Sequence, residues 1–406
     1  MKHFTLISSI AVVLAGVSSW ASAVRTDAAA DIASEEAHED EILTIDRFVP
    51  HVSTVPGFEG QDVELFVRER VRGEADDQRN SDGHHRQRPV VLMVHGSTQT
   101  AVTSFDLPFE DYSWMAFLAH AGFDVFAMDL TGYAASSHAT VMDDACNTSR
   151  SDQLQFLIPN PLAQPCDPSY PFRLTTIGSD WDEIDTVVDY LRQLRGIDRI
   201  HLIGWSRGGP RLGGYAARHP EKVASVFLSG PGYDRNVPDD PPDVLPESGV
   251  PMTVAGIAEF TFEEEPHPMC EDIFDPAIVD VIKSTSRERD PLGSTWGVGG
   301  VLRAPVWNSR WGWNSTFAGR IEAPTLIMAG DLDMTSGVMQ GRNLYDDLRV
   351  DNKVFVHVEC ARHAIVWENQ HMILLRASAE WLQHGTFAGL THGSFFVDTE
   401  GQVHIE

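Results

Sequence analysis

The chain has 406 residues, of which 42% are hydrophobic, and a formal net charge of −29 at pH 7. This length and composition allow one large hydrophobic core, or one core with an insertion. The strong negative charge argues against nucleic acid and anionic membrane surfaces as partners, because the field of the protein would repel them.

The N-terminal residues predict an export signal. Residues 1–23, "MKHFTLISSIAVVLAGVSSWASA", have a basic start, an apolar run and small residues at the end, which is typical of a signal peptide cleaved after Ala23. The apolar run, residues 6–17, is too short to span a bilayer, and no later stretch is long and apolar enough. Residues 24–44 are acidic and Ala-rich and predict a flexible segment. We therefore expect a secreted or periplasmic protein without a membrane span.

Short apolar runs alternate with amphipathic segments through the rest of the chain. After two strand-like segments at 41–55 and 62–71, the predicted strands are 89–96, 123–130, 199–204, 223–230, 324–330 and 353–360, and the predicted helices are 113–122, 179–194, 209–220, 275–290 and 363–385. Continuous apolar strands alternating with helices predict an α/β fold with a mostly parallel sheet and helices on both faces.

Two stretches interrupt the alternation. Residues 134–175 are rich in Pro and turn residues, and residues 235–320 separate two predicted strands by far more than a usual connection. We expect 235–320 to form a cap over the strand ends of a core made of 45–234 and 321–386. The last residues, 387–406, predict a hairpin-like tail that packs outside the sheet.

The four cysteines predict disulfides rather than a metal site. Export favours pairing of an even set of cysteines, and no zinc-binding Cys/His spacing occurs. Cys146 and Cys166 would close a short loop, which leaves Cys270 for Cys360. That second bond would tether the cap to the loop of His363, whereas a free, buried Cys360 is the alternative.

A single serine stands among glycines at residues 204–208, "GWSRG". Ser206 lies between a predicted strand and a predicted helix, with Gly204 and Gly208 two positions away on either side. A sharp strand-to-helix turn exposes such a side chain and presents it beside the N–H groups of the helix start. The small neighbours allow the backbone to turn there, so Ser206 is the candidate nucleophile.

On this motif and its surroundings, the chain resembles the α/β-hydrolase superfamily of serine hydrolases across residues 85–385. In that family the catalytic acid follows the serine in the chain and the histidine comes last. The resemblance implies Asp333 as the acid and His363 as the base that accepts the proton of Ser206.

Alternatives to the acid remain open from the sequence. Asp331 follows the same predicted strand as Asp333, and Asp234 follows the preceding one, where some family members carry the acid. One departure from the family's pattern is Ala134, which stands where many relatives have a glycine.

The resemblance also implies an oxyanion hole made of backbone N–H groups. We expect these from Arg207, the residue after the nucleophile, and from Ser97, with Thr98 as the next choice. His95, in the His-Gly turn before them, is expected to brace this loop rather than to act as an acid or base.

A serine nucleophile implies hydrolysis of a carboxylic ester or lactone through an acyl-serine, on a small-molecule or polymeric substrate and without a cofactor. Trp205, Trp311 and Trp313 suggest an apolar or aromatic substrate pocket, with cap core as their alternative role. A peptidase or amidase of the same fold, a hydrolase of C–C bonds and a non-catalytic binding protein are the alternatives. The sequence leaves the natural substrate and the oligomeric state open.

Overall fold

The computed structural model describes most of the chain. The described residues are 41–73, 88–239, 249–256, 270, 273–296 and 300–406. The predicted signal peptide and nearly all of the acidic segment lie outside them. The chain divides into two units, of which residues 44–71 and 87–406 form one and hold nearly all described residues.

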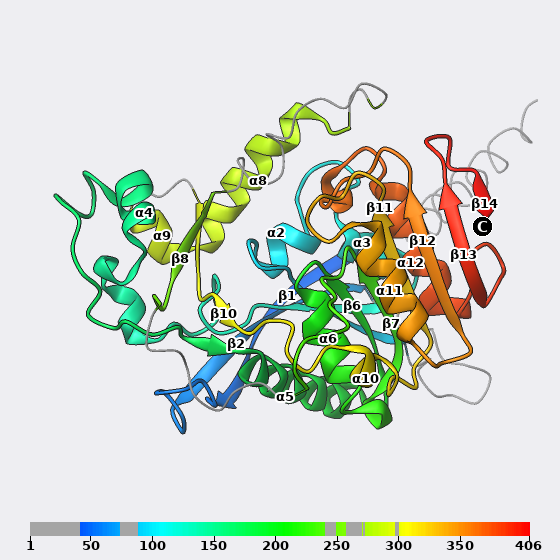
Figure 1. Cartoon of the computed structure of the whole chain (residues 1–406), viewed down its shortest axis with the longest axis horizontal. Helices are drawn as coiled ribbons and strands as arrows, with labels where there is room; N and C mark the ends of the chain where they lie inside the picture. Colours follow the sequence, from blue (N-terminus) through cyan, green and yellow to red (C-terminus); the bar gives the residue numbers. More distant parts are fainter. Residues whose placement is uncertain (1–40, 74–87, 240–248, 257–269, 271–272, 297–299) are drawn as a thin grey trace, which may run out of the picture. The chain divides into compact units, whose positions relative to one another are not determined.

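A ten-stranded sheet forms the centre of this larger unit (Figure 1). In spatial order its strands are β1 (Ile42–Val52), β2 (Asp62–Arg72), β4 (Asp124–Met128), β3 (Val90–Val94), β6 (Ile200–Trp205), β7 (Val223–Ser229), β11 (Thr325–Gly330), β12 (Lys353–Val358), β13 (His392–Val397) and β14 (Val403–Ile405). From β4 to β13 neighbouring strands run parallel, whereas β2 and β14 are antiparallel to their neighbours. The predicted mostly parallel sheet is confirmed.

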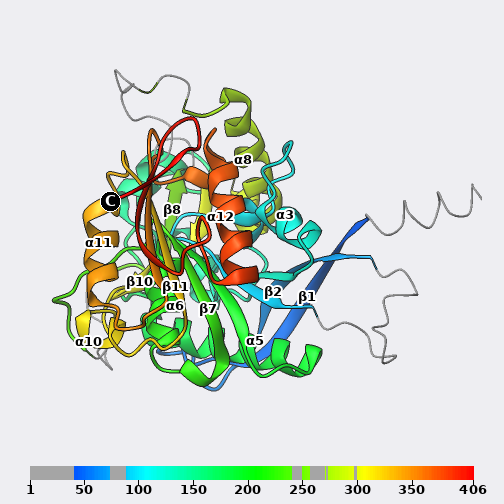
Figure 2. The ribbon, with the colours of Figure 1, turned by 90° about the vertical axis from the view of Figure 1, so that its right-hand side faces the viewer.

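Helices cover both faces of the sheet (Figure 2). They are α2 (Ala101–Phe105), α3 (Trp114–His120), α4 (Arg150–Asp152), α5 (Ile177–Arg195), α6 (Gly208–Ala216), α8 (Pro276–Arg289), α9 (Pro291–Thr295), α10 (Ser315–Ala318), α11 (Gly337–Asp347) and α12 (His371–His384), with short helical turns at Thr140–Asp143, Ala145–Asn147, Gln153–Leu157, Pro220–Lys222 and Ile365–Trp367. Helices α10 and α11 lie on one side of the strands and α3 and α12 on the other. Every residue of β3, "VVLMV", is buried, as expected for a strand covered on both faces.

The start and the end of helix α5, which carries Asp180 and Glu183 near the site, follow from its sequence. Thr176 and Ser179 form a capping box at its start, and Gly196 ends it in the left-handed conformation with φ 63°. Its buried face packs apolar side chains such as Ile184 into the main core. The same face also buries two acids, Asp180 and Glu183, which need polar partners there.

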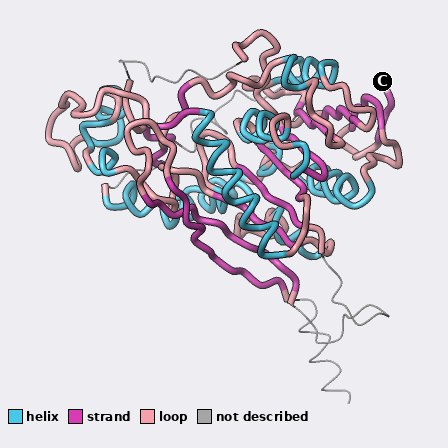
Figure 3. Tube along the Cα trace, turned by 90° about the horizontal axis from the view of Figure 1, so that it is seen from below, coloured by secondary structure: helices cyan, strands magenta, loops and turns pink. Residues whose placement is uncertain are grey.

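The cap differs from the expected single insertion. A second, smaller core draws on both interrupting stretches and is made of Val55, Met142, Ala145, Leu157, Leu174, Met252, Val254, Trp296, Leu302 and Ala304. Two small sheets belong to the same region, an antiparallel pair of β8 (Thr253–Gly256) and β9 (Gly300–Arg303) and a parallel pair of β5 (Thr175–Thr176) and β10 (Val306–Trp307). Loops make up much of it (Figure 3).

The far end of the predicted cap belongs to the main core instead. Trp313 and Phe317 are buried in the main core cluster, although we expected residues 235–320 to lie in the cap. The stretch 139–174, which we placed in the core, supplies Met142, Leu157 and Leu174 to the second cluster. The boundary between the main core and the second cluster therefore depends on where these apolar side chains are buried. It does not depend on whether they lie between predicted strands in the sequence.

The C-terminal residues are part of the sheet rather than an outer tail. Strand β13 pairs in parallel with β12 along its whole length, and β14 pairs with β13 as a hairpin. The N–H of Gly401 donates to the carbonyl of Asp398 at 2.9 Å, so the predicted hairpin turn is present. Phe395 is 1% exposed, and its burial fixes β13 as a core strand.

Both predicted disulfides are present. Cys146 is bonded to Cys166, and Cys270 is bonded to Cys360, three residues before His363. None of the helices in the described part of the chain combines the length and the apolar character that a membrane crossing requires.

Candidate active site

Ser206 stands at a sharp turn between β6 and α6. Its backbone is in the left-handed region, with φ 57°, and its N–H donates to the carbonyl of Ser229 at 2.9 Å. A Cβ at Gly208 would lie 2.2 Å from the carbonyl oxygen of Val94, and a Cβ at Gly204 would lie 2.6 Å from that of Gly208. Close approach of backbone to backbone therefore requires both glycines, and it holds the serine in an unfavourable conformation.

His363 lies between the serine and an acid. Its Nε2 is 2.8 Å from Oγ of Ser206, and its Nδ1 is 2.9 Å from Oδ2 of Asp333. Asp333 follows β11 and His363 follows β12, the next strand in the sheet. Because the carboxyl ends of parallel strands meet at one edge, residues far apart in the sequence gather here.

The surroundings of Asp333 keep its carboxylate charged. Burial by itself would raise the pKa of Asp333, but the hydrogen bond and charge of His363 and the N–H groups of Ser336 and Thr335 outweigh it and lower the pKa below its ordinary value. Those two N–H groups donate to Oδ1 at 2.9 and 2.8 Å, which leaves Oδ2 for the imidazole.

The two alternative acids lie elsewhere. Asp331 is exposed, and its backbone N–H donates to the carbonyl of Val358. Asp234 lines the cavity beside Ser206, and its Oδ1 accepts a hydrogen bond from the N–H of Asn236. Of the three candidates, only Asp333 is hydrogen-bonded to His363 among the interactions of the described residues.

In the loop after β3, the carbonyls of Gly96 and Ser97 each accept hydrogen bonds from side chains. The carbonyl of Gly96 accepts from Nδ1 of His95 at 2.8 Å and from Arg211 at 3.0 Å. The carbonyl of Ser97 accepts from the hydroxyl of Tyr133 at 3.1 Å and from Arg303.

Since the N–H and C=O of a trans peptide point in opposite directions, these contacts fix two N–H groups. Holding the carbonyl of Gly96 fixes the N–H of Ser97, and holding that of Ser97 fixes the N–H of Thr98. A Cβ at Gly96 would lie 3.0 Å from Cβ of Ser206, so this loop runs directly over the serine. Among the described residues, no acceptor is present for the N–H of Ser97 or that of Arg207.

Burial lowers the pKa of His95 well below its ordinary value, and the nearby charge of Arg211 adds to this effect. The imidazole is therefore neutral. Its Nδ1 donates to Gly96, and its Nε2 accepts the N–H of Leu130 at 3.4 Å. This position agrees with the bracing role that the sequence predicts.

Arg211 connects the loop to two helices. Its guanidinium is 0% exposed; Nε donates to Asp180 on α5 at 2.7 Å, and Nη1 donates to the carbonyls of His95 and Gly96 at 2.9 and 3.0 Å. Burial raises the pKa of Asp180, and the charge of Arg211 limits that rise. Arg211 is not among the residues that the sequence predicts for the site. A pattern in the sequence could have revealed it. Arg211 is a charged residue among apolar and small residues on the helix that follows the nucleophile, four positions after Arg207.

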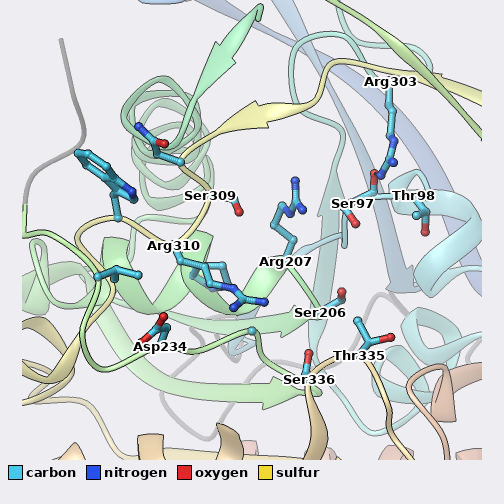
Figure 4. Close-up of a pocket in the computed structure, with 15 residues that line it drawn as sticks. Ser97, Thr98, Ser206, Arg207, Asp234, Arg303, Ser309, Arg310, Thr335 and Ser336 are labelled. Atoms are coloured by element: carbon cyan, nitrogen blue, oxygen red, sulfur yellow. The ribbon is translucent and has the colours of Figure 1, made fainter. Parts of the chain in front are cut away.

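A cavity of about 510 Å³ opens beside Ser206 (Figure 4). Polar side chains dominate its wall, including three arginines, Arg207, Arg303 and Arg310. Trp311 is the one tryptophan among the residues that line it. Most residues that line this cavity are therefore polar or charged, whereas we expected apolar or aromatic ones.

The other two tryptophans are not at the cavity wall. Trp205 donates from Nε1 to the carbonyl of His363 at 2.9 Å, and its ring packs edge-on against Trp367. Trp313 is 0% exposed, and its ring packs edge-on against Tyr233. Both are core residues, because their large apolar surfaces are covered by the helices and by the histidine loop.

The described residues include no group of three His, Cys, Asp or Glu side chains placed to hold a metal ion.

A model of the family described as "alpha/beta hydrolase fold" matches residues 89–370, well over half of the chain. The chain belongs to the α/β hydrolase fold family.

Similarity to individual proteins is weaker. The poly(3-hydroxyalkanoate) polymerase subunit PhaC of Allochromatium vinosum is 39% identical over 57 residues, which cover 14% of this chain and 16% of that protein. The chain thus matches only a small part of this curated relative.

Solved structures with a similar fold include a serine hydrolase of Cycloclasticus zankles, 16% identical with a TM-score of 0.48, covering 84% of this chain and 99% of that one. An esterase of Thermogutta terrifontis is 17% identical with a TM-score of 0.46, covering 83% and 98%.

One difference from many α/β hydrolases is Ala134, where they have glycine. Its φ is 43°, so the loop keeps the left-handed backbone that glycine favours. The neighbouring Tyr133 is buried and holds the carbonyl of Ser97. The substitution therefore leaves the turn in place.

The contacts of Arg211 predict a large loss of stability in Arg211→Met. This change leaves Asp180 buried without its cation, so the free energy of unfolding should fall by about 3–5 kcal/mol. Chemical denaturation measures it, with the exposed Arg199→Met as control. The double variant Arg211→Met/Asp180→Leu should lose less than the single one, and an equal or greater loss would contradict this account.

The buried Glu183 predicts a pH dependence of stability. Burial, together with the charge of Asp180, raises the pKa of Glu183 from 4.5 to about 8. Between these values the folded protein holds a proton that the unfolded chain has released, so its contribution to stability falls as pH rises. In Glu183→Gln the fall in the free energy of unfolding between pH 5 and 8 should be smaller than in the wild type. The exposed Glu64→Gln should leave it unchanged.

Proposed function

We propose that this protein is an exported serine hydrolase that cleaves a carboxylic ester or lactone through an acyl-serine intermediate. The observation that carries the proposal is His363, which lies within hydrogen-bonding distance of both Ser206 and Asp333. Membership of the α/β hydrolase fold family supports a hydrolase. The two disulfides support a protein that folds outside the cytosol.

In the first half of the reaction, Oγ of Ser206 attacks the carbonyl carbon of the ester. Nε2 of His363 accepts the hydroxyl proton, and Asp333 stabilises the imidazolium through Nδ1–H. The oxyanion accepts hydrogen bonds from the N–H of Arg207 and from that of Ser97 or Thr98. The imidazolium then gives its proton to the leaving alkoxide, and the alcohol departs from the acyl-serine.

In the second half, water takes the place of the alcohol. His363 accepts a proton from the water as its oxygen attacks the acyl carbon, and it returns that proton to Oγ of Ser206 as the acid product leaves. In a lactone the alcohol stays attached to the acyl group, and the product is a hydroxy acid. Every step uses side chains and backbone groups of this chain.

The same three side chains could also catalyse the reaction of a peptidase, an amidase or a C–C hydrolase. A non-catalytic binding protein would share the fold without the activity. We favour an ester because alkoxides leave more readily than amines, and the site shows no feature that specifically favours an amide. Paired ester and peptide substrates with the same acyl group distinguish these classes.

Labelling with a neutral fluorophosphonate tests the nucleophile. We expect one adduct on the peptide that carries Ser206 and none in Ser206→Ala, measured by peptide mass spectrometry. Heat-denatured protein should not react, since the serine is activated only by the folded site. An adduct on another serine, or none in the native protein, would reject the proposal.

Variants of the three candidate acids test the role of Asp333. Asp333→Asn should lower kcat on a 4-nitrophenyl ester by roughly 10⁴-fold, because the imidazole loses its orienting charge. The exposed Asp331→Asn is the matched control from the same loop and should keep wild-type kcat. A larger loss in Asp331→Asn or Asp234→Asn than in Asp333→Asn would place the acid elsewhere.

A further inference from the structure

Three guanidinium groups reach the cavity beside Ser206 from different parts of the chain. Arg207 follows the nucleophile, Arg303 ends β9 and Arg310 follows β10. Figure 4 shows the side chains of Arg207 and Arg310 directed into the cavity and Arg303 reaching toward Ser97. This concentration of cations is unexpected in a chain with a net charge of −29.

Two of these arginines, Arg207 and Arg310, form no ion pair in the described part of the chain, and the third, Arg303, is hydrogen-bonded to neutral groups. Arg303 donates to Oγ1 of Thr253 at 3.0 Å and to the carbonyl of Ser97. Within the described ranges, the guanidiniums of Arg207 and Arg310 make no hydrogen bond or ion pair. The one carboxylate on the cavity wall, Asp234, forms no ion pair with either of them among these residues.

The wall offers further unused donors. Nδ2 of Asn308 is buried and has no hydrogen-bond partner among the described residues. Burial lowers the pKa of Arg207 to about 10, so its guanidinium keeps its proton at pH 7 while it has lost much of its hydration. Buried donors and cations of this kind need an acceptor, and a ligand can supply it.

We propose that the substrate is an ester or lactone that carries an anionic oxygen group, favoured as a carboxylate, bound by Arg207 and Arg310 in the cavity beside Ser206. This inference rests on the proposed function and adds the substrate class to it. A guanidinium matches a carboxylate through two parallel N–H···O bonds, and both groups gain when the cavity excludes water.

The position of Arg207 limits where the anionic group lies in the substrate. Its N–H is a proposed donor to the oxyanion, and its side chain lines the same cavity. The scissile carbonyl and the anion therefore belong to one small molecule and are separated by a few bonds. A cavity of about 510 Å³ is of the size that holds a small ligand.

Two 4-nitrophenyl esters that differ at the far end of the acyl chain, one with a carboxylate and one with its methyl ester, provide the test. The substrates are mono-4-nitrophenyl adipate and methyl 4-nitrophenyl adipate, with the 4-nitrophenyl ester of 5-phosphonopentanoate as a second anion. We expect kcat/KM for the mono-adipate to exceed that for the methyl ester by roughly 10- to 100-fold, the range for hydrogen bonds to charged groups. A higher rate on the phosphonate than on the mono-adipate would overturn the preference for carboxylate.

Variants of the arginines test which residues cause the preference for the anionic ester over the neutral one. In Arg310→Gln and Arg207→Gln, the ratio of the two kcat/KM values should fall about tenfold or more, and Arg310→Lys should retain part of it. The exposed Arg199→Gln should leave the ratio and the activity unchanged. Equal ratios in the wild type and in both Gln variants would overturn the proposal.

A binding measurement separates this inference from the proposed function. Ser206→Ala cannot form an acyl-serine, yet it should bind adipate in calorimetry, and the added change Arg310→Gln should abolish that binding. If fluorophosphonate labels Ser206 but the neutral ester is the better substrate and adipate does not bind, the anion site is wrong and the hydrolase stands. If adipate binds but Ser206 is not labelled, the proposed function fails.

Discussion

Arg211 is a fully buried cation that links its own helix, α6, to two other parts of the fold. It joins the helix after the nucleophile to Asp180 on α5 and to the carbonyls of His95 and Gly96 after β3. A buried charge is costly unless it is paired and hydrogen-bonded, so the loss of any of these partners would destabilise the fold. Of these two carbonyls, that of Gly96 sets the direction of the N–H of Ser97. The geometry that a developing oxyanion would meet thus depends on an ion pair beneath the reaction site.

The second constraint is backbone contact at the turn of Ser206. The carbonyl of Val94 leaves no space for a side chain at Gly208, so strand β3 and helix α6 approach each other as closely as backbone atoms allow. The unfavourable φ of Ser206 is maintained by this packing and by its hydrogen bond to Ser229. Strain and close packing therefore place one hydroxyl oxygen 2.8 Å from Nε2 of His363.

The cavity has a character that differs from the rest of the protein. The chain as a whole has a net charge of −29, whereas the wall beside Ser206 carries guanidinium groups and a buried amide donor that has no partner among the described residues. Tryptophans near the site, in contrast, serve packing: Trp205 supports the loop of His363, and Trp313 is buried in the main core. The polar groups that could bind a ligand thus lie on the cavity wall, and the buried tryptophans pack behind them.

The sequence by itself determined the sheet, because buried parallel strands such as β3 and β11 are continuous apolar runs that local patterns reveal. Together with the resemblance to the α/β-hydrolase superfamily, it also indicated Ser206, Asp333 and His363, while leaving Asp331 and Asp234 open as acids. Tertiary structure decided the cap boundary, the place of β13 in the sheet, and which tryptophan lines the cavity. It also gathered Arg207, Arg303 and Arg310 around one space. These outcomes depend on contacts between residues as many as 206 positions apart, such as Ser97 and Arg303, and no local periodicity encodes such contacts.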